Sequence, residues 1–266
     1  MDVEKWGQPP LEHGPCVSCA GLKGWLDMLN EPLQPHHMPP RPSRQATPAQ
    51  IIILGFLGII LAGALLLMLP VSSRMGVVTP FSDALLTATS ATCVTGLVVH
   101  DTATYWSPFG HLVLLALIQT GGMGVVTVAV SVVMFSGRKI GLRQRWVMQE
   151  SISAPQVGGI VRMTSFILKA MLLIEGTGAL LLSLRFCPQF GLLQGLWYGI
   201  FHSVSAFCNA GFDLMGTSAP FSSLTGYVGD PLVWGPIALL ILAGGLGFLT
   251  WQDLREHRLH FRAYRL

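Results

Sequence analysis

The sequence predicts an all-α membrane protein built from two tandem span–pore-loop–span repeats. Charged residues make up only 11% of the 266 residues and hydrophobic residues 51%, with a mean hydropathy of +0.57. Soluble domains carry about 25% charged residues, so this deficit indicates a membrane protein. The second observation is an internal duplication, because the octapeptide beginning at Ser90 (SATCVTGL) returns in altered form at Ser205 (SAFCNAGF). The third is the order of parts, since each copy of the motif lies between two longer apolar segments.

A constant spacing relates the two copies. Gly96 and Gly211 are 115 positions apart, and the same offset carries the pentapeptide at Gly63 onto the one at Gly178. The offset becomes 123 between the glycine clusters 121–124 and 244–247. The additional residues of the second copy therefore fall between its motif and its last apolar segment.

Four apolar segments are predicted to cross the membrane as helices. They cover Ile51–Pro70, Phe109–Phe135, Met163–Phe186 and Pro231–Trp251. About 20 apolar residues are enough for a helix to cross the bilayer. The glycine clusters in the second and fourth segments are expected to let neighbouring helices pack closely, with a hinge as the alternative.

Two shorter helices are predicted before the repeated motifs. Thr79-Pro80 has the form of an N-cap followed by proline at the first helical position, and this helix can extend only to about Thr92. The second covers Leu192–Phe207. Twelve residues or so span roughly 18 Å, about half of a membrane. A half-length helix followed by a glycine turn indicates a re-entrant loop, because non-helical backbone at that depth must line water or be buried in protein.

The turns after these helices have the composition of a cation filter made of backbone carbonyl groups. Several oxygens at fixed range can replace the hydration shell of an alkali cation. Glycine permits the necessary backbone angles, and the C-terminal end of a helix adds partial negative charge. We predict two filter strands, with Gly96 and Gly211 as the critical positions. They consist of Thr92, Cys93, Val94, Thr95 and Gly96, and of Phe207, Cys208, Asn209, Ala210 and Gly211.

The distribution of charge predicts orientation and boundaries. Basic residues gather in the linker 137–162 and the tail 255–266, which marks the cytoplasmic side and places both termini there. The filter loops then enter from outside, where four acids would concentrate cations: Asp83, Asp101, Asp213 and Asp230. The repeats are assigned to 49–136 and 163–254, after a disordered Pro-rich leader, 1–48. Cys16 and Cys19 in that leader lack a second ligand pair, so a zinc site is not expected.

The pattern of span, Ser-Ala-x-Cys-x-x-Gly and span, with CVTGL first and CNAGF second, resembles the Trk/Ktr/HKT potassium transporter superfamily over roughly residues 50–262. The resemblance implies four fused copies of a two-span potassium-channel subunit, arranged with pseudo-fourfold symmetry and with one glycine per filter. It also implies K⁺ as the transported ion, possible coupling to Na⁺, and a cytoplasmic nucleotide-binding regulatory subunit. A bacterial inner-membrane location follows, with the lipid bilayer as surroundings, no organic cofactor and no nucleic-acid partner.

The chain departs from this family in having two filters where four are expected. Either it is the first half of a longer protein, which is the favoured interpretation, or two copies assemble into a pore as a homodimer. A non-conducting membrane fragment or scaffold is an alternative function.

An intramembrane enzyme is the remaining alternative. A thiol nucleophile and its base could be Cys208 with His202, or Cys93 with His100. The duplication argues against catalysis, because the second copy lacks a counterpart of His100. His202 is expected to have a structural role. Glu175, in the third span, is a functional candidate because a carboxylate in the membrane is costly, with pairing to a neighbouring helix or protonation as alternatives.

Overall fold

The computed structural model describes residues 48–124, 127, 160–217, 219–247 and 250–251. The predicted leader (except Pro48), the basic linker up to residue 159, the basic tail and the pair Cys16 and Cys19 lie outside these ranges. Within them every named element is a helix, and one isolated β-bridge joins Ser73 and Trp106. The predicted all-α class is therefore confirmed for the described part of the chain.

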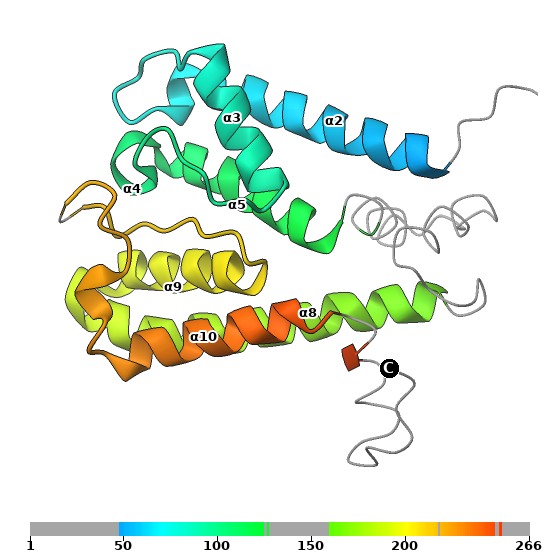
Figure 1. The fold of residues 1–266 in the computed structure, drawn as a ribbon. Coiled ribbons are helices and arrows are strands. Elements are labelled where there is room, and N and C mark those ends of the chain that lie inside the picture. The colour runs from blue at the N-terminus through cyan, green and yellow to red at the C-terminus, as the bar shows by residue number, and fades with distance from the viewer. Residues whose placement is uncertain (1–47, 125–126, 128–159, 218, 248–249, 252–266) are drawn as a thin grey trace, which may run out of the picture. The chain divides into compact units, whose positions relative to one another are not determined.

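The helices occur in the same order twice (Figure 1). The first copy contains a long helix, a short one and a third that returns: α2 (Pro48–Met68), α3 (Phe81–Thr92) and α5 (Pro108–Met123). Short helices η1 (Pro70–Ser72) and α4 (Thr102–Tyr105) lie in its links. The second copy consists of α8 (Ile160–Phe190), α9 (Leu192–Phe207) and α10 (Pro231–Gly245), with η2 (Thr225–Tyr227) before α10.

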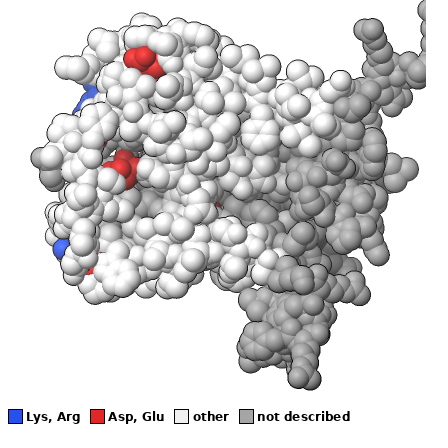
Figure 2. Space-filling model, in the orientation of Figure 1, with Lys and Arg blue, Asp and Glu red and all other residues white. Residues whose placement is uncertain are grey.

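Two of the described helices are long and apolar enough to cross a membrane. They are Ala49–Met68, with mean hydropathy 2.9, and Thr164–Phe190, with mean hydropathy 1.7. Helices α5 and α10 are apolar but shorter. The face shown in Figure 2 has few charged residues, and most of those visible lie toward the edge formed by the links between helices. Side chains such as Ile53 and Leu54 on α2 are exposed, as expected of a helix surrounded by lipid.

Prolines and caps start the third helix of each copy. Pro108 and Pro231 occupy the first helical positions of α5 and α10. Ser107 accepts a hydrogen bond from the backbone N–H of Gly110 (3.2 Å), and Asp230 accepts one from Leu232 (3.1 Å). Proline suits this position because its missing N–H would have no helical partner there.

Glycine ends the same two helices, and this corrects the predicted spans. Helix α5 stops at Met123 because Gly124 has φ +81°, and Gly247, at the equivalent position after α10, has φ +78°. A right-handed helix cannot continue through such a residue. The predictions of uninterrupted helices over Phe109–Phe135 and Pro231–Trp251 are therefore wrong at these glycines.

The short helices differ in how well the sequence predicted them. Leu192–Phe207 has the predicted bounds. Helix α3 begins at Phe81 with Pro80 at the N-cap, so the predicted Thr79 cap is wrong. The Thr79 hydroxyl instead lies 3.1 Å from that of Tyr105. This contact with Tyr105 on α4 holds the Thr79 side chain away from the start of α3.

Equivalent residues make the same packing contact in both copies. A Cβ added at Gly63 on α2 would lie 2.7 Å from the side chain of Leu117 on α5. A Cβ at Gly178 on α8 would lie 2.7 Å from Leu240 on α10. These pairs are related by the two offsets found in the sequence, so the duplication extends to the packing of long against returning helices.

Candidate functional site

The two predicted filter strands have the same backbone conformation. Val94 and Asn209 have φ +56° and +58°, and two positions later Gly96 and Gly211 have φ +74° and +72°. The N–H of Thr95 donates to the carbonyl of Ser90 (3.0 Å), and that of Ala210 donates to Ser205 (2.8 Å). Left-handed angles at a β-branched residue and at Asn are unusual, so the turn is held by its surroundings.

The strands meet at their glycines although 115 residues separate them. A Cβ added at Gly96 would lie 2.8 Å from the carbonyl oxygen of Ala210 and 3.4 Å from the Cα of Gly211. A Cβ at Gly211 would lie 3.5 Å from the Cα of Gly96. The fold therefore brings the two predicted critical positions side by side at the ends of α3 and α9.

Most carbonyl groups of these two turns accept no hydrogen bond from the residues that the structure describes. Within the described part of the chain, no hydrogen bond is donated to the carbonyl oxygens of residues 93–96 or 208–211. Side chains support the strands at other atoms, since Thr95 Oγ1 donates to Ser90 Oγ (2.9 Å) and Ser205 Oγ donates to the Phe212 carbonyl. Cys93, Thr95, Asn209 and Gly211 are exposed, so two adjacent sets of carbonyl oxygens are open to solvent or to a ligand.

The first glycine of each cluster packs against the end of its half-helix. A Cβ at Gly121 would contact the carbonyl group of Thr92, 2.8 Å from its carbon, and a Cβ at Gly244 would lie 2.9 Å from the carbonyl carbon of Phe207. Any side chain here would displace the first residue of a filter strand. The expected role in close packing thus holds for these two glycines, whereas Gly124 and Gly247 end the helices.

The copies are joined through α5. A Cβ at Gly122 would collide with the side chain of Cys208, 2.8 Å from its Cβ. Nearby, Gln119 Nε2 donates to both carboxylate oxygens of Glu175 on α8, at 3.1 Å each. Pairing with a neighbouring helix, one of the alternatives for Glu175, is therefore observed. The sequence did not single out Gln119, because a lone polar residue in an apolar run gives no sign of its partner.

His202 holds the chain beyond the second strand. Its Nδ1 lies 2.7 Å from the carbonyl oxygen of Tyr198, and its Nε2 accepts a hydrogen bond from the backbone N–H of Leu214 (3.2 Å). The Nδ1 hydrogen therefore goes to Tyr198, and both ring nitrogens are engaged with backbone. This arrangement supports the expected structural role and leaves neither nitrogen available as a base for Cys208.

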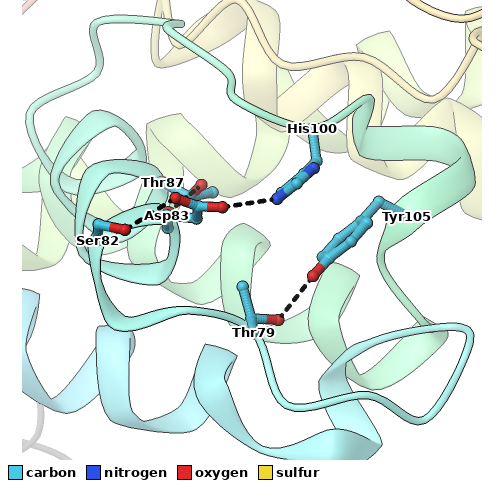
Figure 3. A network of polar contacts seen from close by, with 6 residues as sticks. All are labelled: Thr79, Ser82, Asp83, Thr87, His100 and Tyr105. Atoms are coloured by element: carbon cyan, nitrogen blue, oxygen red, sulfur yellow. Dashed lines mark hydrogen bonds and ion pairs between the residues drawn. The ribbon is translucent and has the colours of Figure 1, made fainter.

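His100 belongs to a separate polar network beside the start of α3 in the first copy (Figure 3). Its Nε2 lies 3.0 Å from Asp83 Oδ2, and its ring stacks on Tyr105 with centroids 3.9 Å apart. The hydroxyls of Tyr105 and Thr79 then face each other. The network links the start of α3 to the segment that follows the first filter strand.

The other three acids that the sequence singled out also make hydrogen bonds or ion pairs. Asp230 pairs with Arg185 (2.5 Å), and Asp101 accepts from the N–H groups of Thr104 and Phe221, which ties the two copies together. Asp213 accepts from the N–H of Met215. Burial raises the pKa of the Tyr227 hydroxyl, which donates to Gln189 (2.9 Å). Pairing with Arg185 neutralises the charge of Asp230.

Side-chain metal coordination is not indicated. Among the residues that the structure describes, no group of three or more His, Cys, Asp or Glu side chains is placed to hold a metal ion.

Comparison with known proteins identifies the family. The sequence profile TrkH, described as "Cation transport protein", matches residues 23–265. The chain belongs to this family of cation transporters. It is 41% identical over 220 residues to the potassium/sodium uptake protein NtpJ of Enterococcus hirae, covering 83% of this chain and 48% of that protein. It is 43% identical over 222 residues to the Ktr system potassium uptake protein B of Bacillus subtilis, covering 83% and 48%.

The comparisons confirm the resemblance found in the sequence and exclude one of the alternative functions. The family consists of transporters and not of enzymes, so the Cys-dependent enzyme is dropped. A third relative, the Ktr system potassium uptake protein B of Vibrio alginolyticus, is 39% identical over 208 residues, 78% of this chain and 44% of that protein. The chain spans about half the length of the curated relatives it matches.

Proposed function

We propose that the chain forms half of a transmembrane pathway for K⁺, in which the backbone carbonyls of residues 92–96 and 207–211 replace the hydration shell of the ion. Each unit of α2–α3–α5 and α8–α9–α10 then serves as one span–pore-loop–span repeat of a pseudo-fourfold pore. The observation that carries the proposal is the adjacency of two equivalent turns whose carbonyl oxygens at residues 93–96 and 208–211 accept no hydrogen bond from the described part of the chain. Carbonyl oxygens bind alkali cations without adding net charge.

Residue identity in the turns supports K⁺ as the ion. Both critical positions are glycine, which the superfamily resemblance associates with K⁺, and three relatives carry potassium uptake in their names. One of them is named for potassium and sodium, so Na⁺ is the second ion that the pathway would carry or couple to.

Charge and family together suggest the surroundings. The basic segments 137–162 and 255–266 place both termini on the cytoplasmic side of a bacterial inner membrane. A nucleotide-binding subunit of the Ktr type would dock on that face, since the relatives from Bacillus subtilis and Vibrio alginolyticus are named as Ktr system proteins. The mouth acids Asp83, Asp101 and Asp213 would face outside and attract cations.

The test is growth of a potassium-uptake-deficient bacterium at low K⁺, together with Rb⁺ uptake. The wild-type chain, produced together with the other half of the pathway, is expected to support both, and Gly96→Ser and Gly211→Ser are expected to reduce uptake and its preference for K⁺ over Na⁺. Gly229→Ser is the matched control, because Gly229 is exposed with no atom within 4 Å of an added Cβ. Uptake and K⁺ preference in both filter variants equal to those of the wild type would contradict the proposal.

A further inference from the structure

The two copies meet a second time, just beyond the glycines of the filter turns. The offset of 115 that relates Gly96 to Gly211 also relates Asp101 to Gly216. A Cβ added at Gly216 would collide with the carboxylate of Asp101. Equivalent residues of the two copies are therefore in contact at both places, and at the second place only the first copy has a side chain.

The carboxylate of Asp101 accepts hydrogen bonds from both copies. Its Oδ2 accepts from the backbone N–H of Thr104 (3.0 Å) and from the hydroxyl of the same residue (2.7 Å), which caps α4. Its Oδ1 accepts from the N–H of Phe221 (2.9 Å), 120 positions later in the link between α9 and α10. That link passes beside α4 (Figure 1). Asp101 is only 9% exposed, and hydrogen bonds to an ionised acceptor are stronger than those between neutral groups.

The segment that carries Asp101 is anchored within the first copy. His111 Nε2, on α5, lies 2.8 Å from the carbonyl oxygen of Thr102 at the start of α4. Directly after α4, an isolated β-bridge joins Trp106 to Ser73, and the Trp106 side chain is buried. The carboxylate is therefore presented to the second copy from a fixed part of the first.

The partner segment in the second copy depends on this hydrogen bond. Phe221 has φ +60°, in the left-handed region that a bulky residue rarely adopts. Its ring is 60% exposed, so packing of the ring does not account for the conformation, whereas the bond from its N–H to Asp101 does. Phe221 lies between Gly211 and Pro231, where the second copy is longer than the first. The lengthened link is thus held by a residue of the other copy.

We propose that Asp101 is a positioning residue of the ion pathway, which holds the second filter turn against the first through the link that follows it. The inference rests on the proposed function, because the arrangement of the carbonyl oxygens around Gly96 and Gly211 is what would select the ion. Both carboxylate oxygens of Asp101 accept hydrogen bonds from the protein, so this residue acts through the turns and not as an ion ligand. Its charge also attracts cations from a distance, and salt screens that attraction far more than it weakens buried hydrogen bonds.

Asparagine at position 101 tests the hydrogen bond and its consequence, in the chain produced together with the other half of the pathway. One amide oxygen cannot replace two carboxylate oxygens, so Asp101→Asn should lower the protection of the Phe221 amide against hydrogen exchange at least about tenfold. Protection of amides inside α9 should not change, which shows that the variant is folded. The KM for Rb⁺ uptake should rise and the preference for K⁺ over Na⁺ should fall, at low and high ionic strength alike. Asp230→Asn is the matched control, because the bonds of this capping residue to Arg185 and Leu232 stay within the second copy.

A second variant reaches the same contact from the other copy. Gly216→Ala displaces the carboxylate of Asp101 without removing its charge, so it should reproduce both the lost protection of Phe221 and the lost ion preference. Gly229→Ala, with no atom within 4 Å of the added Cβ, is its control. Only Asp101→Asn changes the charge, so the two variants together separate positioning from electrostatic attraction.

Three outcomes would overturn the positioning role. One is protection of the Phe221 amide in Asp101→Asn equal to that of the wild type. Another is lost protection with unchanged KM and ion preference, which leaves the proposed function standing because Gly96→Ser and Gly211→Ser test it separately. The third is an effect of Asp101→Asn that disappears at high ionic strength and is absent from Gly216→Ala, as electrostatic attraction alone would give. Filter variants equal to the wild type would instead reject the proposed function, and the positioning role with it, whatever the protection of Phe221.

Discussion

Gly96 and Gly211 lie in contact, with a Cβ on Gly211 only 3.5 Å from the Cα of Gly96. Both have φ above +70°, and both follow a half-length helix. The contact places the two turns side by side, and the carbonyl oxygens of residues 93–96 and 208–211 accept no hydrogen bond from the described residues.

Alanine is expected to be tolerated less at Gly96 than at Gly211. Left-handed φ costs a side chain about 1–2 kcal/mol at either position. The Cβ at Gly96 would in addition approach the Ala210 oxygen to 2.8 Å, whereas at Gly211 the nearest atom lies at ordinary contact distance. Rb⁺ uptake and thermal unfolding should therefore rank wild type above Gly211→Ala and Gly211→Ala above Gly96→Ala. The reverse ranking would contradict the described contact.

Removing the Gln119 amide is expected to destabilise the protein through Glu175. Gln119→Leu leaves the buried carboxylate without its donor, at a cost of about 1–3 kcal/mol in unfolding free energy. The double variant Gln119→Leu, Glu175→Met should recover most of that loss. Thr177→Ala, at an exposed position on the same helix as Glu175, is the control and should change the free energy of unfolding little. Additive losses in the double variant would show that the pair does not interact.

His202 is expected to matter for the order of the segment after the second strand. His202→Phe leaves the N–H of Leu214 without its acceptor, which should cost about 1–3 kcal/mol. His202→Gln keeps a donor and an acceptor and should retain part of the stability. Hydrogen exchange at Leu214 measures the effect, and protection equal to wild type in His202→Phe would rule out this role.

The glycines that touch the half-helix ends should resist substitution more than exposed glycines. Gly121→Ala and Gly244→Ala force the carbonyls of Thr92 and Phe207 away, and overpacking of this kind typically costs about 1–3 kcal/mol. Gly229→Ala meets no atom within 4 Å and serves as control. Thermal unfolding in detergent compares the three variants, and equal melting temperatures would contradict the packing.

Much of the fold could be predicted from local sequence patterns and from the internal duplication. Apolar length predicted α2 and α8, the bounds of α9 were predicted correctly, and the repeated motif identified the two turns that meet. These features depend on nearest neighbours in sequence or on comparison of the chain with itself. The proposed filter role of residues 92–96 and 207–211 stays a prediction.

Features that depend on distant partners were not predictable in this way. The pairing of Gln119 with Glu175 and the bond from Leu214 to His202 join residues whose spacing obeys no helical period. The end of α5 at Gly124 was missed because glycine is common inside membrane helices, and only its surroundings decide whether φ becomes positive. Thr79 does not cap α3, because its hydroxyl is in contact with the hydroxyl of Tyr105 instead.

Anomalous diffraction from crystals soaked in Tl⁺, a heavy stand-in for K⁺, tests the central claim most directly. The account predicts a Tl⁺ peak bound by backbone carbonyl oxygens of residues 92–96 and 207–211, weakened by competing K⁺ and absent in Gly96→Ser. Tl⁺ found only at acidic side chains such as Asp83 or Asp213, with none at the paired turns, would contradict it.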